Sequence, residues 1–164
     1  MRVRLANSAD IAAMMKVELQ SPGAAHWSQS QYELLFADTN DKSGSKHFAW
    51  VVENESAGRS ENARGEESEL LAFLVAQRIG GEWELENMAV DPSVRRHGVG
   101  TLLLQKLISQ ARAEDGRSIF LEVRESNLGA RALYGRFDFE RTGTRKSYYS
   151  DPPEDAFLYR LALN

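Results

Sequence analysis

The sequence of 164 residues contains no cysteine. This absence excludes disulfide bonds, cysteine nucleophiles and thiolate metal sites. No window approaches the roughly 18 consecutive apolar residues of a transmembrane helix, and the N-terminal segment lacks the apolar core of a signal peptide. We therefore predict a cytoplasmic protein with no membrane partner.

The sequence also contains few histidines and carries only a small net charge. The three histidines, His26, His47 and His97, lie far apart and show no ligand spacing, so we predict no metal site. A net charge of −4 argues against a general nucleic-acid-binding surface, although it allows a local basic patch. The hydrophobic fraction of 42% and the chain length suit a single folded domain over residues 1–164, as a monomer or a homodimer.

Hydrophobic periodicity predicts an α/β protein with a mixed sheet. We expect strands at 3–6, 47–53, 70–79, 82–90, 118–124, 139–149 and 156–163, and helices at 7–20, 27–36, 98–116 and 126–137. Ser8 is the expected N-cap of the first helix, whose apolar residues at helical spacing are Ile11, Met14, Met15 and Leu19. Ser28 and Gln31 have the spacing of a capping box in the second helix.

A polar, acidic segment separates two of the expected strands. Residues 53–69 contain no aromatic side chain and almost nothing to bury. We predict a solvated loop that connects the strands of a hairpin, and we assign it no function.

The segment "RRHGVG" at 95–100 lies between an expected strand and an expected helix. The N-terminus of a helix attracts phosphate, and Gly98 and Gly100 would let the backbone approach phosphate oxygens. A Walker A loop needs a lysine before Thr101, and a Rossmann fingerprint needs a third small residue where Leu103 stands. The remaining pattern is Arg/Gln-x-x-Gly-x-Gly/Ala.

This pattern is typical of the pyrophosphate loop of the GCN5-related N-acetyltransferases (GNAT), which bind acetyl-coenzyme A. The flanks "ENMAVDPSVRRHGVGTLLLQKLI" and "LEVRESNLGARALYGRFDF" resemble that family, and "KSYYSDPPEDAFLYRLAL" resembles the tail of its bacterial ribosomal-protein-alanine N-acetyltransferases. The detailed resemblance covers residues 70–163. In the N-terminal half only the order of elements and the Trp27-Ser28 pair match. The chain departs from the subgroup in "SPGAAHWS", a loop expected to shape the acceptor pocket, and in Asp138, which replaces a glycine.

The resemblance implies a GNAT fold: a sheet of about six to seven strands, splayed at the acetyl-CoA site and flanked by about four helices. It also implies which residues bind the cofactor. These are Met88, Ala89, Val90, Arg95, Arg96, His97, Gly98, Val99, Gly100, Thr101, Asn127 and Tyr134.

Acetyl transfer to an amine needs a base for the amine, a donor for the oxyanion and an acid for the departing thiolate. By resemblance Glu122 is the general base, acting through water, and Tyr134 is the general acid. Strand alternation places Glu122 on the face opposite Leu121 and Val123. Its alternative role is a salt bridge with Arg124 or Arg131, and the alternative role of Tyr134 is core packing.

Two further groups of polar residues have open roles. Glu84 and Glu86 share a strand face and are rival bases, or they supply negative charge that suits a cationic amine. Tyr148, Tyr149, Glu154 and Asp155 match the subgroup's tail and either line the acceptor groove or form an ordinary tyrosine-rich strand and turn.

The resemblance thus implies an acetyl-CoA-dependent N-acetyltransferase that needs no metal. The expected acceptor is the α-amine of a protein N-terminus, with the ribosomal-protein alanine type as its model. The alternatives are a small-molecule amine, a lysine side chain, and a non-catalytic sensor that binds acyl-CoA.

Overall fold

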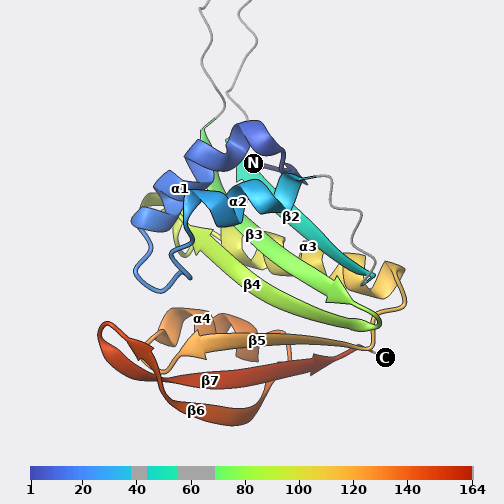
Figure 1. Cartoon of the computed structure of the whole chain (residues 1–164), viewed down its shortest axis with the longest axis vertical. Coiled ribbons are helices and arrows are strands. Elements are labelled where there is room, and N and C mark those ends of the chain that lie inside the picture. Colours follow the sequence, from blue (N-terminus) through green and yellow to red (C-terminus); the bar gives the residue numbers. More distant parts are fainter. Residues whose placement is uncertain (38–43, 55–68, 164) are drawn as a thin grey trace, which may run out of the picture.

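The computed structural model describes residues 1–37, 44–54 and 69–163, which form a seven-stranded sheet with helices on both faces (Figure 1). The strands are β1 (Arg2–Leu5), β2 (Ser45–Glu53), β3 (Leu70–Ile79), β4 (Glu82–Val90), β5 (Ser118–Arg124), β6 (Glu140–Ser150) and β7 (Pro153–Ala162). The helices are α1 (Ile11–Leu19), α2 (Gln29–Phe36), α3 (Val99–Ala113) and α4 (Leu128–Gly135), with 3-10 turns at Ser8–Asp10 and Pro92–Val94. The predicted α/β class and order of elements are confirmed. Most of the predicted polar loop, residues 55–68, lies outside the described residues.

The sheet divides between β4 and β5. The strand order is β1-β2-β3-β4-β5-β7-β6, and β4 with β5 is its one parallel pair. That pairing joins only Glu82–Leu85 to Ser118–Leu121. Beyond it, β4 stays with β3 as far as Val90, and β5 stays with β7 as far as Arg124. The two halves of the sheet therefore diverge, and the ribbons of β4 and β5 separate in Figure 1; we call the region between their unpaired ends the gap.

A β-bulge lies where the separation begins. Ala76 pairs with Leu85 and the adjacent Val75 pairs with Asn87, so Glu86 is an extra residue in β4. A bulge shifts the alternation of side chains by one position. Accordingly Trp83 and Leu85 before the bulge, and Met88 and Val90 after it, pack on the same hydrophobic cluster.

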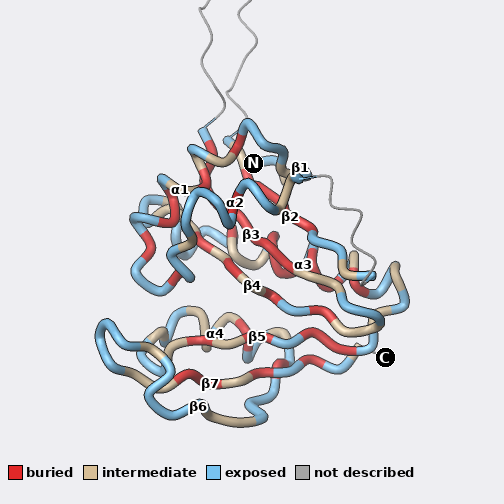
Figure 2. Tube along the Cα trace, viewed as in Figure 1, coloured by how far each residue is buried: buried red, intermediate tan, exposed pale blue. Residues whose placement is uncertain are grey.

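Two hydrophobic clusters hold the helices to the sheet, and burial is concentrated in β2–β5 while β6 is mostly exposed (Figure 2). One cluster packs α3 and Tyr134 of α4 against one face. Its largest fully buried members are Trp50, Trp83, Leu74, Leu103, Leu104, Leu107, Ile119 and Leu121. The other cluster packs α1 and α2 against the opposite face through Met14, Tyr32, Phe73 and Val51.

The start and the buried face of the first helix differ from the prediction. Asn7, not Ser8, is the cap of the 3-10 turn that leads into α1, and it forms a capping box with Asp10. The buried residues of α1 are Met14, Val17 and Glu18, whereas Leu19 is 78% exposed. The apolar pattern predicted that Leu19 would be buried, but the buried residue in this turn of α1 is its neighbour Glu18.

Other local signals are confirmed. Ser28 and Gln31 form the expected capping box at α2. Asp138 adopts a left-handed conformation with φ of 62°, which fits the place of a glycine. After the end of α3, Asp115 adopts a positive φ of 54°.

Candidate active site

The predicted pyrophosphate loop leads into α3 as expected. Gly98 is the N-cap of α3 with φ of 81°, a conformation that favours glycine. The first intrahelical bond runs from Leu102 N to Gly98 O, so the amides of Val99, Gly100 and Thr101 have no acceptor within the helix. Unpaired amides at the positive end of a helix dipole are a chemically suitable place for an anion.

Gly100 has a packing role that the sequence did not suggest. A methyl group at Gly100 would lie 3.1 Å from both Leu133 Cδ2 and Met88 Cε. The glycine therefore lets α3 approach α4 and β4 closely. Gly98 has open space around it, so of the two glycines it is the one that leaves room beside the backbone.

The three basic residues of the loop are placed differently. All three are exposed, but they differ in their hydrogen bonds. Arg95 points back into the protein: its Nε donates to Val90 O (3.1 Å), and its Nη2 donates to Ser21 Oγ (3.2 Å) and Gln20 O (3.4 Å). In this structure Arg95 connects the end of α1 to the end of β4.

Met88, Ala89 and Val90 form the open edge of β4. They pair with Leu74, Phe73 and Ala72 of β3 on one side, and no β5 residue pairs with them on the other side. The carbonyl of Val90 is occupied by Arg95 Nε and Ser21 Oγ. The backbone of Met88 has no strand partner on the β5 side, so it can hydrogen-bond an extended ligand, which is the property expected of a pantetheine-binding strand.

Asn127 lies on the opposite side of the gap and caps α4. Its Oδ1 accepts a hydrogen bond from Ala130 N (3.2 Å). Its amide nitrogen packs against Gly23, where any side chain would overlap it. The connection between α1 and α2 therefore reaches across the gap to the start of α4, as Figure 1 also indicates beside the tip of β4.

Glu122 and Tyr134 lie on opposite faces of the sheet. The side chains of Ile119, Leu121 and Val123 pack in the cluster under α3, so the alternating Glu122 projects from the other face, as predicted. Tyr134 belongs to the cluster under α3 and α4 and is 6% exposed.

The ion-pair partner of Glu122 is not one of the predicted arginines. Arg145 Nε of β6 lies 2.9 Å from Glu122 Oε1, and the Glu122 side chain is 23% exposed. Arg124 instead pairs with Glu154 (3.3 Å), and Arg131 Nη1 donates to Glu125 O (2.6 Å). Arg145 comes from a strand far along the chain, and no local spacing signals it.

Tyr134 is held by aromatic packing. Its ring lies 5.7 Å from that of Phe139 and 6.3 Å from that of Tyr159. Burial, with a smaller effect of Tyr149, raises the pKa of Tyr134 well above its ordinary value of 10. The hydroxyl therefore keeps its proton at neutral pH, which is the state that a proton donor requires.

The pKa values of the two rival bases, Glu84 and Glu86, are both raised. Burial first, and the charge of Glu84 second, raise the pKa of Glu86 to about 7. Burial and the charge of Glu122 raise the pKa of Glu84, while Arg145 opposes this. Glu86 Oε2 lies 3.3 Å from His47 Nε2, within ion-pair distance but without the geometry of a hydrogen bond.

The tail residues mostly attach the β6–β7 hairpin to the end of β5, and one pair lies within the hairpin. Glu154 pairs with Arg124 and accepts from Ser126 N, and Asp155 pairs with Lys146 (2.9 Å). The Arg124 guanidinium lies 3.9 Å from the centroid of the Tyr149 ring. Tyr148 is 50% exposed, and the charge of Glu122, followed by burial and hydrogen bonding, raises the pKa of its hydroxyl. Of the tail residues, Tyr148 is therefore the one whose pKa depends most on the charge of Glu122.

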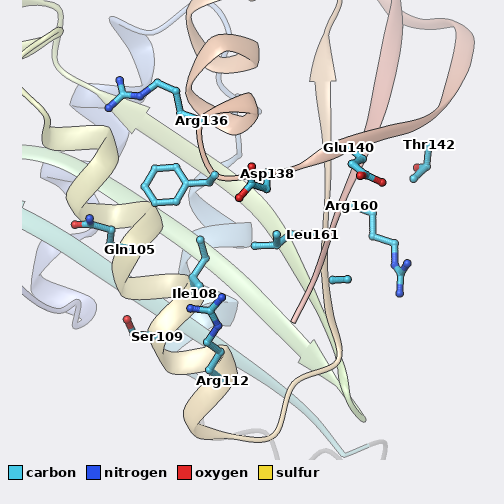
Figure 3. A pocket seen from close by; sticks show the side chains of 12 residues that line it. Gln105, Ile108, Ser109, Arg112, Arg136, Asp138, Glu140, Thr142, Arg160 and Leu161 are labelled. Atoms are coloured by element: carbon cyan, nitrogen blue, oxygen red, sulfur yellow. The ribbon is translucent and has the colours of Figure 1, made fainter. Parts of the chain in front are cut away.

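Two concavities lie near these elements. One, of about 380 Å³, crosses the open face of the sheet and is lined by Glu84, Glu122, Phe120, Arg145, Gln77 and Leu158. The other, of about 540 Å³, lies between the second half of α3, the end of α4 and the β6–β7 pair (Figure 3). It contains none of the predicted site residues, and in Figure 3 Arg160 points away from it. Of the two concavities, the smaller groove is the one lined by the candidate bases Glu84 and Glu122.

Sequence reasoning missed one polar group near the gap. Glu18 of α1 is 3% exposed and binds Tyr32 and Asn87, which are 0% and 2% exposed. Glu18 follows Met14 by four residues, which places the two on one face of α1, and this spacing was the available signal.

Among residues 1–37, 44–54 and 69–163 there is no cluster of three or more potential metal ligands. No helix in the part of the chain that the structure describes is long and apolar enough to cross a membrane.

Solved structures share this fold over the whole chain. The ribosomal-protein-S18-alanine N-acetyltransferase of Escherichia coli aligns with a TM-score of 0.76 and 26% identity, covering 99% of this chain and 94% of that one. Arabidopsis thaliana NAA60 in complex with acetyl-CoA aligns with a TM-score of 0.79 over 99% and 98% of the two chains. Its identity of 16% supports the fold alone.

Sequence relatives point the same way. The [ribosomal protein bS18]-alanine N-acetyltransferase of Escherichia coli K12 is 37% identical over 97 residues, which are 58% of this chain and 66% of that protein. The matched part is thus slightly less than two thirds of the relative's length. A putative enzyme of the same name from Bacillus subtilis is 35% identical over 81 residues, 49% of this chain and 54% of that protein. The acetyltransferase (GNAT) family model matches residues 12–139, and the chain therefore belongs to this family.

Proposed function

We propose that the protein is an N-acetyltransferase that moves the acetyl group of acetyl-CoA to the α-amine of a protein N-terminus. The observation that carries the proposal is the open gap between β4 and β5, with an anion-binding helix end beside it and with Glu122 and Tyr134 on opposite faces. Such an arrangement lets a thioester and an amine meet from two sides of the sheet. The Escherichia coli relative, named for an alanine acceptor on ribosomal protein bS18, supports the choice of acceptor.

The donor would lie along the open edge of β4. The amides at the start of α3 would hold the pyrophosphate, with Arg96 and His97 exposed nearby. The backbone of Met88–Val90 would bind the pantetheine amides, and Asn127 would meet them from α4. Since Arg95 is engaged with Gln20, Ser21 and Val90, we assign it to holding the loop and not to direct phosphate contact.

The reaction proposed is a direct attack. Glu122 accepts a proton from the acceptor amine through a water molecule, and the amine nitrogen forms a bond to the thioester carbonyl carbon. The tetrahedral intermediate then loses the sulfur, and Tyr134 transfers its proton to the departing thiolate. The products are an acetylated amine and coenzyme A. Backbone donors near Met88 are the candidates for stabilising the oxyanion.

Glu86 is the rival base, because a pKa of about 7 suits proton transfer at neutral pH. Glu122 is favoured by its position on β5, the strand that borders the gap and leads to Asn127 and α4. The two assignments are separated below by matched variants.

The test of the function is a panel of acceptors with acetyl-CoA. Release of coenzyme A is followed with a thiol reagent, to which this cysteine-free protein contributes no background. A peptide with N-terminal alanine is compared with the same peptide carrying a blocked N-terminus and an internal lysine, and with a polyamine. We expect acetylation of the free N-terminus, located by mass spectrometry.

Two other outcomes would contradict the proposal, and each would indicate a different function. Preference for the lysine peptide or the polyamine would make the protein an acetyltransferase of another substrate class. No turnover with any acceptor, together with acetyl-CoA binding measured by calorimetry, would make it an acyl-CoA sensor.

A further inference from the structure

A buried carboxylate without a cationic partner lies behind the gap. Glu18 Oε1 accepts from Asn87 Nδ2 (2.7 Å), Glu18 Oε2 accepts from the Tyr32 hydroxyl (2.8 Å), and both oxygens accept from Trp27 N (3.1 Å). Among the described residues no lysine, arginine or histidine lies within ion-pair distance of it. A buried charge that depends on neutral donors is costly unless all of them are in place.

The donors come from three different elements. Trp27 is at the end of the α1–α2 loop (residues 20–28), Tyr32 is in α2, and Asn87 follows the Glu86 bulge in β4. Asn87 adds a second link, because its Oδ1 accepts from Ala25 N (3.3 Å). Glu18 and Asn87 together therefore fasten the α1–α2 loop to the part of β4 that borders the gap.

The α1–α2 loop has a strained backbone between these two links. His26 has φ of 56°, which is uncommon outside glycine and costs about 1 kcal/mol or more. The hydrogen-bonded amides of Ala25 and Trp27 flank it on either side. Asn87 and Glu18 therefore hold the residues on both sides of His26.

The α1–α2 loop also reaches the far side of the gap. Gly23 packs against Asn127 at the start of α4, and Ser21 hydrogen-bonds Val90 O (3.3 Å) and Arg95. It therefore borders the opening through which an acceptor must pass to meet a thioester held along Met88–Val90.

We propose that Glu18 is a positioning residue for the acceptor: by fixing the α1–α2 loop against β4, it sets the shape of the acceptor side of the gap. This inference rests on the proposed function, since it assigns the acceptor to that side. It predicts that disturbing Glu18 impairs acceptor binding more than donor binding.

The principal variant is Glu18→Gln, which keeps the size of the side chain but turns one acceptor oxygen into a donor facing other donors. The matched control is Glu33→Gln, the same chemical change on the exposed side of α2. We expect Glu18→Gln to raise the acceptor KM about tenfold or more, in line with the loss of hydrogen bonds to a charged group, and to change the KM of acetyl-CoA less than about twofold. Glu33→Gln should change neither constant.

A rescue variant separates positioning from general destabilisation. In Glu18→Gln with Asn87→Asp, the amide and the carboxylate exchange places, and the bond between α1 and β4 is restored with reversed direction. We expect part of the acceptor KM to recover. Amide hydrogen exchange should be faster at residues 20–28 in Glu18→Gln than in the parent, and unchanged in β5.

Three results would overturn the inference. They are an unchanged acceptor KM in a folded Glu18→Gln protein, an equal rise of both KM values with faster exchange across the whole sheet, and no recovery in the double variant. A parent protein that acetylates nothing would refute the proposed function instead. In that case the exchange at residues 20–28 alone would decide whether Glu18 holds the loop.

Discussion

Among single residues, Glu86 is the carboxyl group whose acidity the fold changes most clearly. The bulge in β4 turns it toward His47, burial raises its pKa to about 7, and the charge of Glu84 adds to the effect. Its ordinary value is 4.5. Between these two values the folded protein holds a proton that the unfolded chain releases.

The free energy of unfolding should therefore depend on Glu86. Its contribution is fully present below pH 4.5 and is lost as the pH rises through about 7. We expect Glu86→Gln to lose less stability than the parent between pH 5 and pH 8, measured by urea unfolding across that range. If the free energy of unfolding changed with pH in the same way in both proteins, the pKa of Glu86 would not be raised.

Glu122 is tested by its effect on turnover. We expect Glu122→Gln to lower kcat/KM by about 10² to 10⁴, the range typical of a general base. Glu140→Gln, the same change at an exposed position of β6, should have no effect. A larger loss in Glu86→Gln than in Glu122→Gln would assign the base to Glu86.

Tyr134→Phe removes the proposed acid and keeps the packing against Phe139 and Tyr159. We expect kcat to fall about 10² or more, since general acid catalysis contributes at least that much, while coenzyme A binding measured by calorimetry stays the same. Equal turnover in parent and variant would leave Tyr134 with a packing role alone.

At the scale of elements, the close approach of α3 to α4 and β4 depends on Gly100. Met88 and Leu133 occupy the space that a side chain would need. Gly129 of α4 offers a comparison, because it is exposed and has nothing within contact distance of an added methyl group.

Alanine at these two positions should have different effects. Gly129→Ala should raise the free energy of unfolding by about 0.5–1 kcal/mol, because alanine is the better helix former. The free energy of unfolding of Gly100→Ala should rise by less than that of Gly129→Ala, or should fall, because the new methyl group would lie 3.1 Å from Met88 and Leu133. Urea unfolding checks both, and an equal gain would mean that α3 has room to move.

Structural features that depend on neighbouring residues could be predicted from the sequence, whereas features that depend on residues far apart in the chain could not. The capping box of Ser28 with Gln31 depends on a few adjacent positions, and it was correctly predicted. The bulge at Glu86 and the Arg145–Glu122 ion pair depend on strands that meet only in the folded sheet. The placement of Glu122 opposite Leu121 and Val123 followed from alternation, whereas the buried place of Glu18 did not, because a charged residue interrupts the apolar pattern of α1.

At the scale of the whole molecule, the sheet is two antiparallel units joined by four residue pairs between β4 and β5. Helix α3 connects the same two strands along the chain. The edges of Met88–Val90 and of Val123–Arg124 at the gap have no partner strand across it.

Binding of acetyl-CoA should be visible at these edges. We expect amide hydrogen exchange to slow at residues 86–90 when acetyl-CoA is added, because the ligand replaces the missing strand partner. Exchange in β2, which is fully paired with β3, should not change. Protection confined to residues around the larger concavity, such as 105–112, would place the ligand elsewhere.

The single parallel junction has a consequence for how the chain folds. The pairs β3–β4 and β6–β7 are each joined by two residues, so these two pairings are local in the sequence. Joining β4 to β5 must wait for the right-handed crossover through α3. We therefore expect substitutions in the buried face of α3, such as Leu107→Ala, to slow refolding, and substitutions in β6 chiefly to speed unfolding.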